Sequence, residues 1–333
     1  MSGKVKSALI LITSLVVVAC GGGGSGGGGG DTPTLSPLSI TTANAPAVSG
    51  EVVNATDAVE GFGGGSSGTI LAAVTTTGGD RQSLVDVIRS QLDRFPLLQN
   101  AASNAVVGAV VGPTTFACAV SGTTTVSGNL ADPASLSAGD SLSATFSSCD
   151  EGNGSILGGG LSMRVDALSG DPSASVFDIT IAVTLNNLTV TDAGETMTGS
   201  GDIRLALGSS DGVTLTTALS GNAMAVSGLG RSIALKDYAI TSTLNQGTLD
   251  YSLTSNGTLQ SADLGGSVVF STVATFQGVG GNFPYTGTYL ITGQNSSVRL
   301  TALDDVNVVL DIDDNGDGAV DTTVNTTWAA ISG

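Results

Sequence analysis

Histidine is absent from all 333 residues of the chain. Without imidazole the protein cannot form Ser-His-Asp or Cys-His catalytic sites, and it lacks the usual general base near neutral pH. Imidazole metal sites are excluded for the same reason. Aromatic residues contribute only 4% of the composition, which disfavours the aromatic girdles of a transmembrane barrel. We therefore expect a protein that is not an enzyme.

Positive charge is also scarce. The chain has ten Lys and Arg against 28 Asp and Glu, for a formal net charge of −18. Nucleic acids and anionic membrane surfaces both require clustered cations. The composition therefore predicts no nucleic-acid partner and no electrostatic attachment to lipid headgroups.

The N-terminal segment contains the first of only three cysteines. Lys4 and Lys6 precede a largely apolar run that ends in Val-Val-Ala-Cys at Cys20, and this run is too short to span a bilayer. The run resembles the lipobox of bacterial lipoproteins. That resemblance implies a signal peptide over residues 1–19, cleavage before Cys20, lipid (including palmitate) on Cys20, and a membrane partner reached through that lipid. Gly21, rather than aspartate, after the cysteine implies the outer membrane.

The remaining two cysteines, Cys118 and Cys149, would form a pair in an oxidising compartment. We expect a disulfide bond between them. Two free, buried thiols acting as small apolar residues are the alternative.

Glycine and proline dominate the region that follows Cys20. Ten residues after this cysteine include nine glycines, and Pro33, Pro37 and Pro46 follow. Such a composition predicts a flexible tether over residues 20–50. With its threonine-rich body, the chain resembles the Gly-tethered envelope lipoproteins of proteobacteria, which implies location in the cell envelope and no activity.

One segment has helical periodicity. Leu84, Ile88 and Leu92 recur at spacings of four between a possible cap at Asp80 and the interruption at Pro96. We predict a helix over residues 81–95 within an N-terminal region 51–112. A second short helix over residues 100–111 is the further expectation.

From residue 113 to residue 333 the period of the apolar residues changes to two. Phe177, Ile179, Ile181, Val183 and Leu185 alternate with polar residues, and the same pattern recurs at 203–207, 249–253, 306–312 and 320–328. Turn-forming residues separate these segments, for example at 209–212, 245–247 and 255–257. The pattern predicts a mostly β fold, an antiparallel meander that forms a curled sheet, half-barrel or barrel, or splits into a sandwich. A parallel β-helix is disfavoured because no constant repeat is visible.

The most specific motif lies near the C-terminus, in the sequence Asp313-Asp-Asn-Gly-Asp-Gly-Ala-Val-Asp321. The spacing resembles the first part of an EF-hand-type or dockerin-type calcium loop, with a glycine at the sixth position where the sharp bend falls. The acidic ligand at position twelve is replaced by Val324. A bare acidic hairpin turn is the alternative. The candidate calcium ligands are Asp313, Asn315, Asp317, Ala319 and Asp321.

Three functions remain open. The first is a lipid-anchored, non-enzymatic structural or binding module that is stabilised by calcium and faces the periplasm or the cell surface. The second is a carrier or chaperone that holds an apolar ligand in a half-barrel. The third is a glycan hydrolase based on two carboxylates, for which Asp166, Asp178, Asp202 and Asp250 are available on predicted strands, although the sequence pairs no two of them. A protein, a glycan or a lipid could be the ligand.

Overall fold

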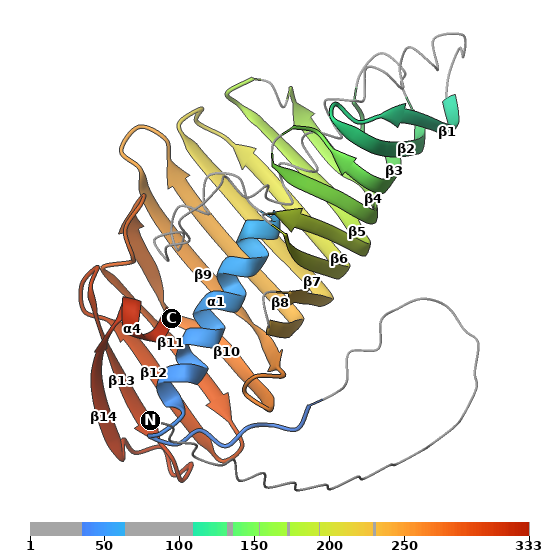
Figure 1. Ribbon diagram of the computed structural model, residues 1–333. Coiled ribbons are helices and arrows are strands. Elements are labelled where there is room, and N and C mark those ends of the chain that lie inside the picture. The colour runs from blue at the N-terminus through green and yellow to red at the C-terminus, as the bar shows by residue number, and fades with distance from the viewer. Residues whose placement is uncertain are drawn as a thin grey trace, which may run out of the picture. The chain divides into compact units, whose positions relative to one another are not determined.

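A single antiparallel sheet of fourteen strands dominates the fold, and each strand pairs only with its neighbours in sequence (Figure 1). The computed structural model describes residues 35–63, 109–131, 136–152, 154–171, 174–192, 194–228 and 231–332, all within one compact unit that spans residues 31–333. The first and last strands are not paired with each other, so the sheet is open. The predicted antiparallel meander is therefore confirmed, without closure into a barrel.

The strands grow longer toward the middle of the sheet and shorten again toward its C-terminal end. They are β1 (Ala109–Ala117), β2 (Ser121–Leu130), β3 (Ser141–Asp150), β4 (Ser155–Gly170), β5 (Phe177–Asp192), β6 (Glu195–Ser209), β7 (Thr214–Gly228), β8 (Arg231–Asn245), β9 (Asp250–Ser261), β10 (Gly266–Val279), β11 (Thr286–Gly293), β12 (Ser296–Ala302), β13 (Asn307–Asp313) and β14 (Thr322–Thr327). Strand β1 begins four residues before the start predicted for the β region.

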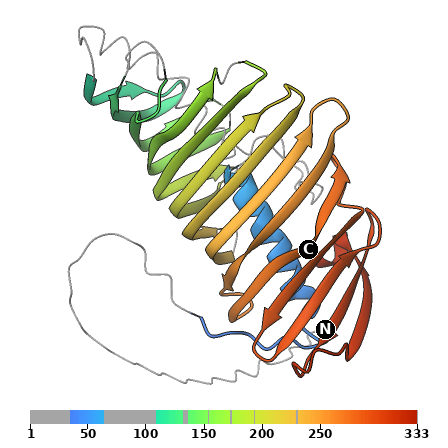
Figure 2. The same cartoon turned by 180° about the vertical axis from the view of Figure 1, so that it is seen from behind.

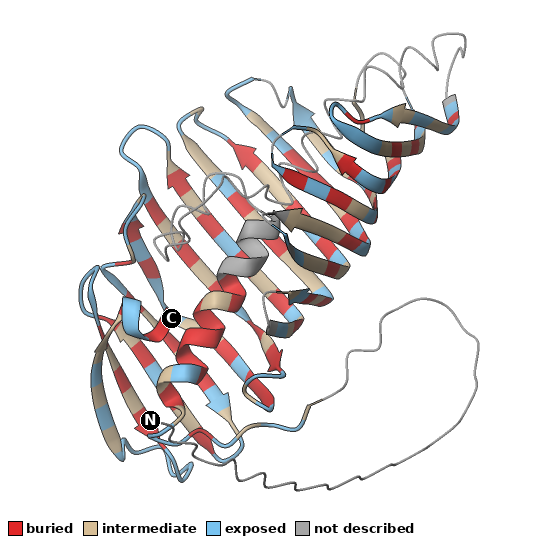
Figure 3. Ribbon diagram, in the orientation of Figure 1, coloured by how far each residue is buried: buried red, intermediate tan, exposed pale blue. Residues whose placement is uncertain are grey.

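Alternating burial gives the sheet two different faces. In β5, Ile179, Ile181, Val183 and Leu185 are buried while Thr184 is exposed, as the period of two predicts. Figure 3 shows the same alternation on the other long strands. We call the face that carries these apolar side chains the inner face and the opposite one the outer face.

A row of irregular positions crosses strands β3 to β6 and β8. Ser148, Gly159, Asn187, Gly201 and Asp237 all have positive φ, on β3, β4, β5, β6 and β8. The pairing register shifts beside each of them. Bulges of this kind bend a strand and increase its twist, and Figure 2 shows the curved strands from behind. The bend keeps the apolar residues on the inner face on both sides of the row.

Helix α1 (Ala45–Gly63) packs against the inner face, where it contacts β8, β9, β12 and β13 (Figure 1). Val48, Val52 and Val53 are buried, and so is Glu51, whose Oε1 accepts a hydrogen bond of 2.9 Å from Ser261 Oγ. Over residues 45–56, where its side chains are described, α1 is buried on most sides, and such a helix needs apolar and small residues all round. Its sequence therefore lacks the amphipathic stripe that marks a surface helix.

The prediction of a flexible tether up to residue 50 is wrong for residues 35–50. Leu38 exchanges backbone hydrogen bonds with the sheet, donating to Ser267 O at 2.9 Å and accepting from Gln294 N at 2.7 Å. Ile40 is fully buried. Pro46 is compatible with the helix because it is the second helical residue, where a backbone amide hydrogen would have no partner within the helix.

A second helix, α4 (Trp328–Ser332), folds back from β14 onto α1. The carbonyl oxygen of Ile331 lies so close to Gly50 that a Cβ atom there would collide with it. Asn54 Nδ2 donates to Ser332 O at 3.2 Å. Glycine at position 50 thus allows the C-terminal end of the chain to seat against α1.

Aromatic residues gather beside α4. The indole ring of Trp328 stacks on Phe283, with ring centroids 5.6 Å apart, and meets Phe276 edge-on at 6.2 Å. Trp328 Nε1 donates to Pro284 O at 3.2 Å, so the buried indole is satisfied. Tyr289 adds a further contact with Phe276 at 4.5 Å. This group of four residues, which we call the aromatic cluster, holds the C-terminal end of the inner face together.

Other sequence predictions need correction or remain outside the described residues. The predicted helix 81–95 lies outside them, and the last part of the helix predicted for 100–111 belongs to β1. The turn predicted at 255–257 lies inside β9, because the register shift between Lys236 and Ala239 accommodates the Asn-Gly pair without reversing the strand. Trp328 belongs to α4 rather than to the last strand. Of the helices in the described ranges, none has the length and apolar character needed to cross a bilayer.

Candidate functional site

The loop between β13 and β14 contains the calcium-like motif. Asp313, which is nearly buried, accepts backbone hydrogen bonds from Gly316 N at 2.7 Å and Gly318 N at 2.9 Å. Both glycines have positive φ, +78° and +86°, a conformation that glycine adopts without strain. The loop therefore wraps around the carboxylate of Asp313.

Further oxygen atoms of the motif fix the rest of the loop. Asn315 Oδ1 accepts from Asp317 N, and Asp317 Oδ1 accepts from Ala319 N, each at 2.8 Å. Asp321 Oδ2 accepts from Asp314 N at 2.9 Å, and both oxygens of Asp321 accept from Asn315 Nδ2 at 3.2 Å. The four predicted ligands with side-chain oxygens thus occupy one hydrogen-bonded loop.

Negative charge accumulates in this loop. Desolvation, the nearby charges of Asp321 and Asp313, and a hydrogen bond with Asp321 together raise the pKa of Asp314. A divalent cation would relieve this repulsion. However, the described residues bring no three carboxylates of this loop within 4.8 Å of one another, and Val324 at the twelfth position is half-buried on β14. The loop is consistent with either the calcium or the bare-turn interpretation.

The two body cysteines stand at disulfide distance, with Cα atoms 5.5 Å apart. Cys118 directly follows β1 and Cys149 lies in β3, so the pair links the edge strand to the third strand across β2. Glu151 lies close enough to complete a three-residue group. Because paired cysteines are not free thiolates, this group is not a metal site.

The four acids considered for glycoside hydrolysis lie on different strands. Asp166 forms ion pairs with Arg164 at 2.8 Å and Arg204 at 3.3 Å. Asp202 accepts from Thr184 at 2.7 Å, and Asp250 accepts from Thr248 at 2.6 Å.

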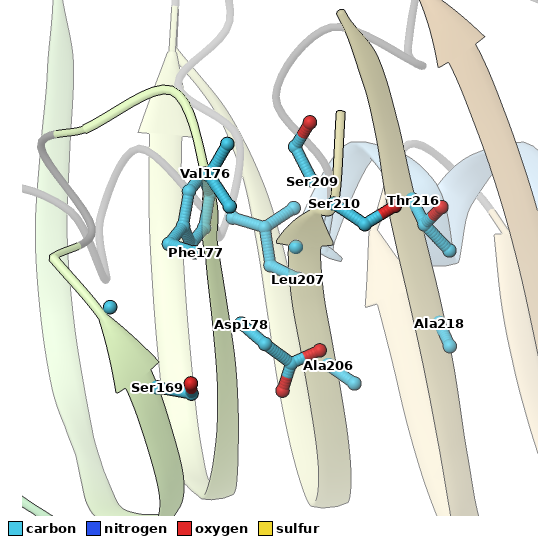
Figure 4. A pocket seen from close by; sticks show the side chains of 12 residues that line it. Ser169, Val176, Phe177, Asp178, Ala206, Leu207, Ser209, Ser210, Thr216 and Ala218 are labelled. Carbon is cyan, nitrogen blue, oxygen red and sulfur yellow. The ribbon is translucent and has the colours of Figure 1, made fainter. Parts of the chain in front are cut away.

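Asp178 instead lines a hollow that sequence reasoning did not find. The hollow has a volume of about 480 Å³ at the ends of β4 to β7 and includes Phe177, Leu207 and Ser209 (Figure 4). Gly170 and Gly208 also line it, and their missing side chains are the only sequence signal that could have indicated it. The hollow is open and has both polar and apolar walls, without the enclosed apolar volume that a lipid would need.

Hydroxyl side chains make hydrogen bonds to side chains of the neighbouring strand along the outer face, either to another hydroxyl or to a carboxylate. Such pairs join β1 to β2, β5 to β6, β8 to β9, β11 to β12, and β13 to β14. The pairs are Thr115–Thr125 (2.9 Å), Thr191–Thr196 (2.8 Å), Thr243–Ser252 (2.7 Å), Thr288–Thr301 (3.4 Å) and Thr323–Asp311 (2.7 Å). The outer face is therefore a broad polar surface that extends from one edge of the sheet to the other.

Cys20 lies outside the described residues, so the lipidation site remains a prediction from sequence. Comparison with protein-family models, with curated proteins and with solved structures gave no match.

Proposed function

We propose that the chain is a lipid-anchored envelope lipoprotein that acts as a non-enzymatic structural or binding module. The anchoring part of the proposal rests on the residues around Cys20. The observation that supports the binding part is the outer face, where hydroxyl side chains make hydrogen bonds between neighbouring strands at several places from β1 to β14. Such a face offers many weak hydrogen-bonding groups, which suits a polar polymer or another protein better than a single small molecule.

The inner face gives little support to the carrier alternative. Leu161, Leu188, Leu259 and Leu310 are at most 1% exposed. Where side chains already fill the apolar face, a lipid would have to displace them. A ligand carrier needs an apolar hollow, and the hollow found among the described residues is open and partly polar.

Calcium binding is the more specific part of the proposal. An ion in the 313–321 loop would bind Asp313, Asn315, Asp317 and Asp321 through side-chain oxygens and Ala319 through its carbonyl oxygen, as the motif predicts. Desolvation is the first cause of the raised pKa of Asp314, and the nearby charges of Asp321 and Asp313, which add to it, support a cation there. Its role would be to stabilise the hairpin at the end of the sheet.

Metabolic labelling tests the anchor. We expect radiolabelled palmitate to be incorporated into the native chain and lost from Cys20→Ala, which should also leave the membrane fraction. The double variant Cys118→Ala/Cys149→Ala is the matched control and should keep the label. Labelling of Cys20→Ala would contradict the anchor.

Protease treatment of intact cells tests which side of the envelope the module faces. Digestion in intact cells would indicate binding outside the cell. Survival until the outer membrane is opened, alongside a periplasmic marker, would indicate a role in the periplasm. Recovery of the protein in the cytoplasmic fraction, whether the outer membrane is intact or opened, would contradict the proposed location.

A further inference from the structure

The two edges of the open sheet differ in their ability to accept another strand. Strand β1 contains Pro113, which has no amide hydrogen, and its register shifts between Val111 and Thr114. Proline and bulges are the devices that protect a sheet edge from pairing. Strand β14 has the sequence Thr-Thr-Val-Asn-Thr-Thr, without proline, charge or any register shift against β13. Figures 1 and 2 both show β14 at the outer margin of the described sheet.

The hydrogen bonds of β14 determine which of its backbone groups face outward. Trp328 N donates to Val306 O at 3.0 Å, in continuation of the register in which Thr326 faces Val308 and Val324 faces Leu310. In an antiparallel pair, hydrogen-bonded positions alternate along the strand. Thr322, Val324 and Thr326 therefore bond to β13. The backbone N–H and C=O groups of Thr323 and Asn325, and the N–H of Thr327, point away from it. Thr327 also caps α4, where its hydroxyl accepts from Ala330 N at 3.2 Å.

We propose that β14 is the contact through which two copies of the chain join, antiparallel and edge to edge. Outward-facing positions must meet outward-facing positions, and centring the two-fold axis on Asn325 uses all three of them. Asn325 then faces Asn325 of the second copy, and Thr323 faces Thr327 of the second copy. On the inner face, Val324 meets Thr326 of the second copy. Cross-strand threonine pairs, such as Thr323 with Thr327 of the second copy, stabilise neighbouring strands.

Charge favours a second copy at this edge rather than at most other parts of the surface. In a chain of net charge −18, contacts between two copies generally bring acids together. The side chains of β14 are all neutral. Acids flank the strand at its ends, at Asp321 and in the turn that contains Asp304, and Asp311 on β13 accepts a hydrogen bond from Thr323. The antiparallel arrangement brings these two ends together, so added salt should strengthen the dimer by screening their repulsion.

Sedimentation of the purified full chain over a wide concentration range tests the proposal. We expect the mass of the native chain and of Asn325→Ala to approach twice the monomer mass as concentration rises. Asn325→Pro removes only an outward-facing amide hydrogen, so it should remain monomeric while β13 and β14 stay paired. A native chain that is monomeric throughout, or an Asn325→Pro variant that associates as the native chain does, would overturn the proposal.

Cross-linking tests the two-fold contact through β14 independently, even if Asn325→Pro fails to fold. In a Cys20→Ser background, Asn325→Cys places two thiols opposite each other on the axis, at a Cα separation of about 5.5 Å that a disulfide accepts. Thr323→Cys, on the same strand but off the axis, is the matched control, and Thr115→Cys tests the β1 edge. We expect a covalent dimer from Asn325→Cys alone. Equal cross-linking by all three variants, or none from Asn325→Cys, would overturn the two-fold contact.

Discussion

The two ends of the fourteen-stranded sheet are stabilised by different means. At the β1 end, Cys118 and Cys149 join the edge strand to β3, and the inner face there is mainly aliphatic. At the β14 end, Trp328 and its aromatic neighbours fill the space under α1 and α4. An edge strand has a neighbour on one side only, so each end of an open meander needs a contact beyond backbone pairing. The comparison shows that a covalent link and a packed aromatic cluster can meet the same need.

The largest expected effect is at the C-terminal end. Trp328→Ala removes a side chain that is 1% exposed and leaves a cavity beside Phe276 and Phe283. We expect a loss of about 3–5 kcal/mol in the free energy of unfolding, measured by chemical denaturation. Trp328→Phe is the control and should lose clearly less. Equal losses in the two variants would show that the aromatic packing does not stabilise this end.

Removal of the disulfide should weaken the other end. The loop it closes has a sequence separation of 31, and the double variant Cys118→Ala/Cys149→Ala should lose about 2–4 kcal/mol of stability. Hydrogen exchange should localise the loss to β1–β3 and leave β11–β14 protected. A uniform loss of protection would mean that the two ends are not stabilised separately.

The bulge row predicts an intermediate effect in the middle of the sheet. Gly201 has φ +124°, and an added Cβ would lie 2.7 Å from Met224 Cα. Gly201→Ala should therefore destabilise the protein by about 1–3 kcal/mol. Gly112→Ala is the matched control, because nothing lies within 4 Å of a Cβ there. If the two variants have the same melting temperature, the bulge does not require glycine at position 201.

Calcium would sharpen the contrast between the two ends by stabilising only the β14 end. At calcium concentrations several times Kd, we expect about 1 kcal/mol of added stability in the native chain. Asp313→Asn should abolish most of this gain, whereas Asp178→Asn, outside the loop, should retain it. No calcium-dependent shift in melting temperature in the native chain would leave the bare acidic turn as the explanation of the motif.

The smallest expected effect on stability comes from aspartates that accept backbone hydrogen bonds in turns, a feature that both halves of the sheet share. Backbone hydrogen bonds from Thr214 and Val213 lower the pKa of Asp211 to about 2. A hydrogen bond from the side chain of Asn307, with backbone hydrogen bonds from Asn307 and Val306, lowers the pKa of Asp304. A depressed carboxyl pKa stabilises the fold above the unfolded value, and this contribution is lost as pH falls through the folded value.

Stability of Asp211→Asn should therefore lie below that of the native chain at neutral pH, and the gap should narrow between about pH 4 and about pH 2. Asp304→Asn should behave similarly. Denaturation curves at several pH values measure the gap, and a gap that widens on acidification would contradict the assignment.

Sequence periodicity predicted the strands well where one face is apolar and the other polar, as in β5 from Phe177 to Leu185. It failed for α1, because a helix buried on most sides has no polar stripe and its Ala, Val and Thr residues are equally compatible with other structures. It also extended strands through Leu249 and Val320, which continue the alternation but are exposed and lie outside the strands. Bulges at Asn187 and Asp237 depend on cross-strand register, which a single strand does not specify.

The candidate site was only partly predictable. Local spacing placed Asp313 to Asp321 in one loop, and the cysteine count paired Cys118 with Cys149. The outer-face hydroxyl pairs require knowledge of which strands are adjacent and in what register, for example Thr243 opposite Ser252. The outward backbone groups of β14 depend on the same information.

The order of the meander has a consequence for how the chain folds. Every strand pairs with the next one in sequence, so the sheet can grow hairpin by hairpin through contacts of short sequence separation. Helix α1 precedes all the strands, yet its hydrogen bonds connect residues 210 and 278 positions apart, at Ser261 and Ser332. Helix α1 can therefore reach its final contacts only after β9 and the C-terminal end of the chain have been synthesised.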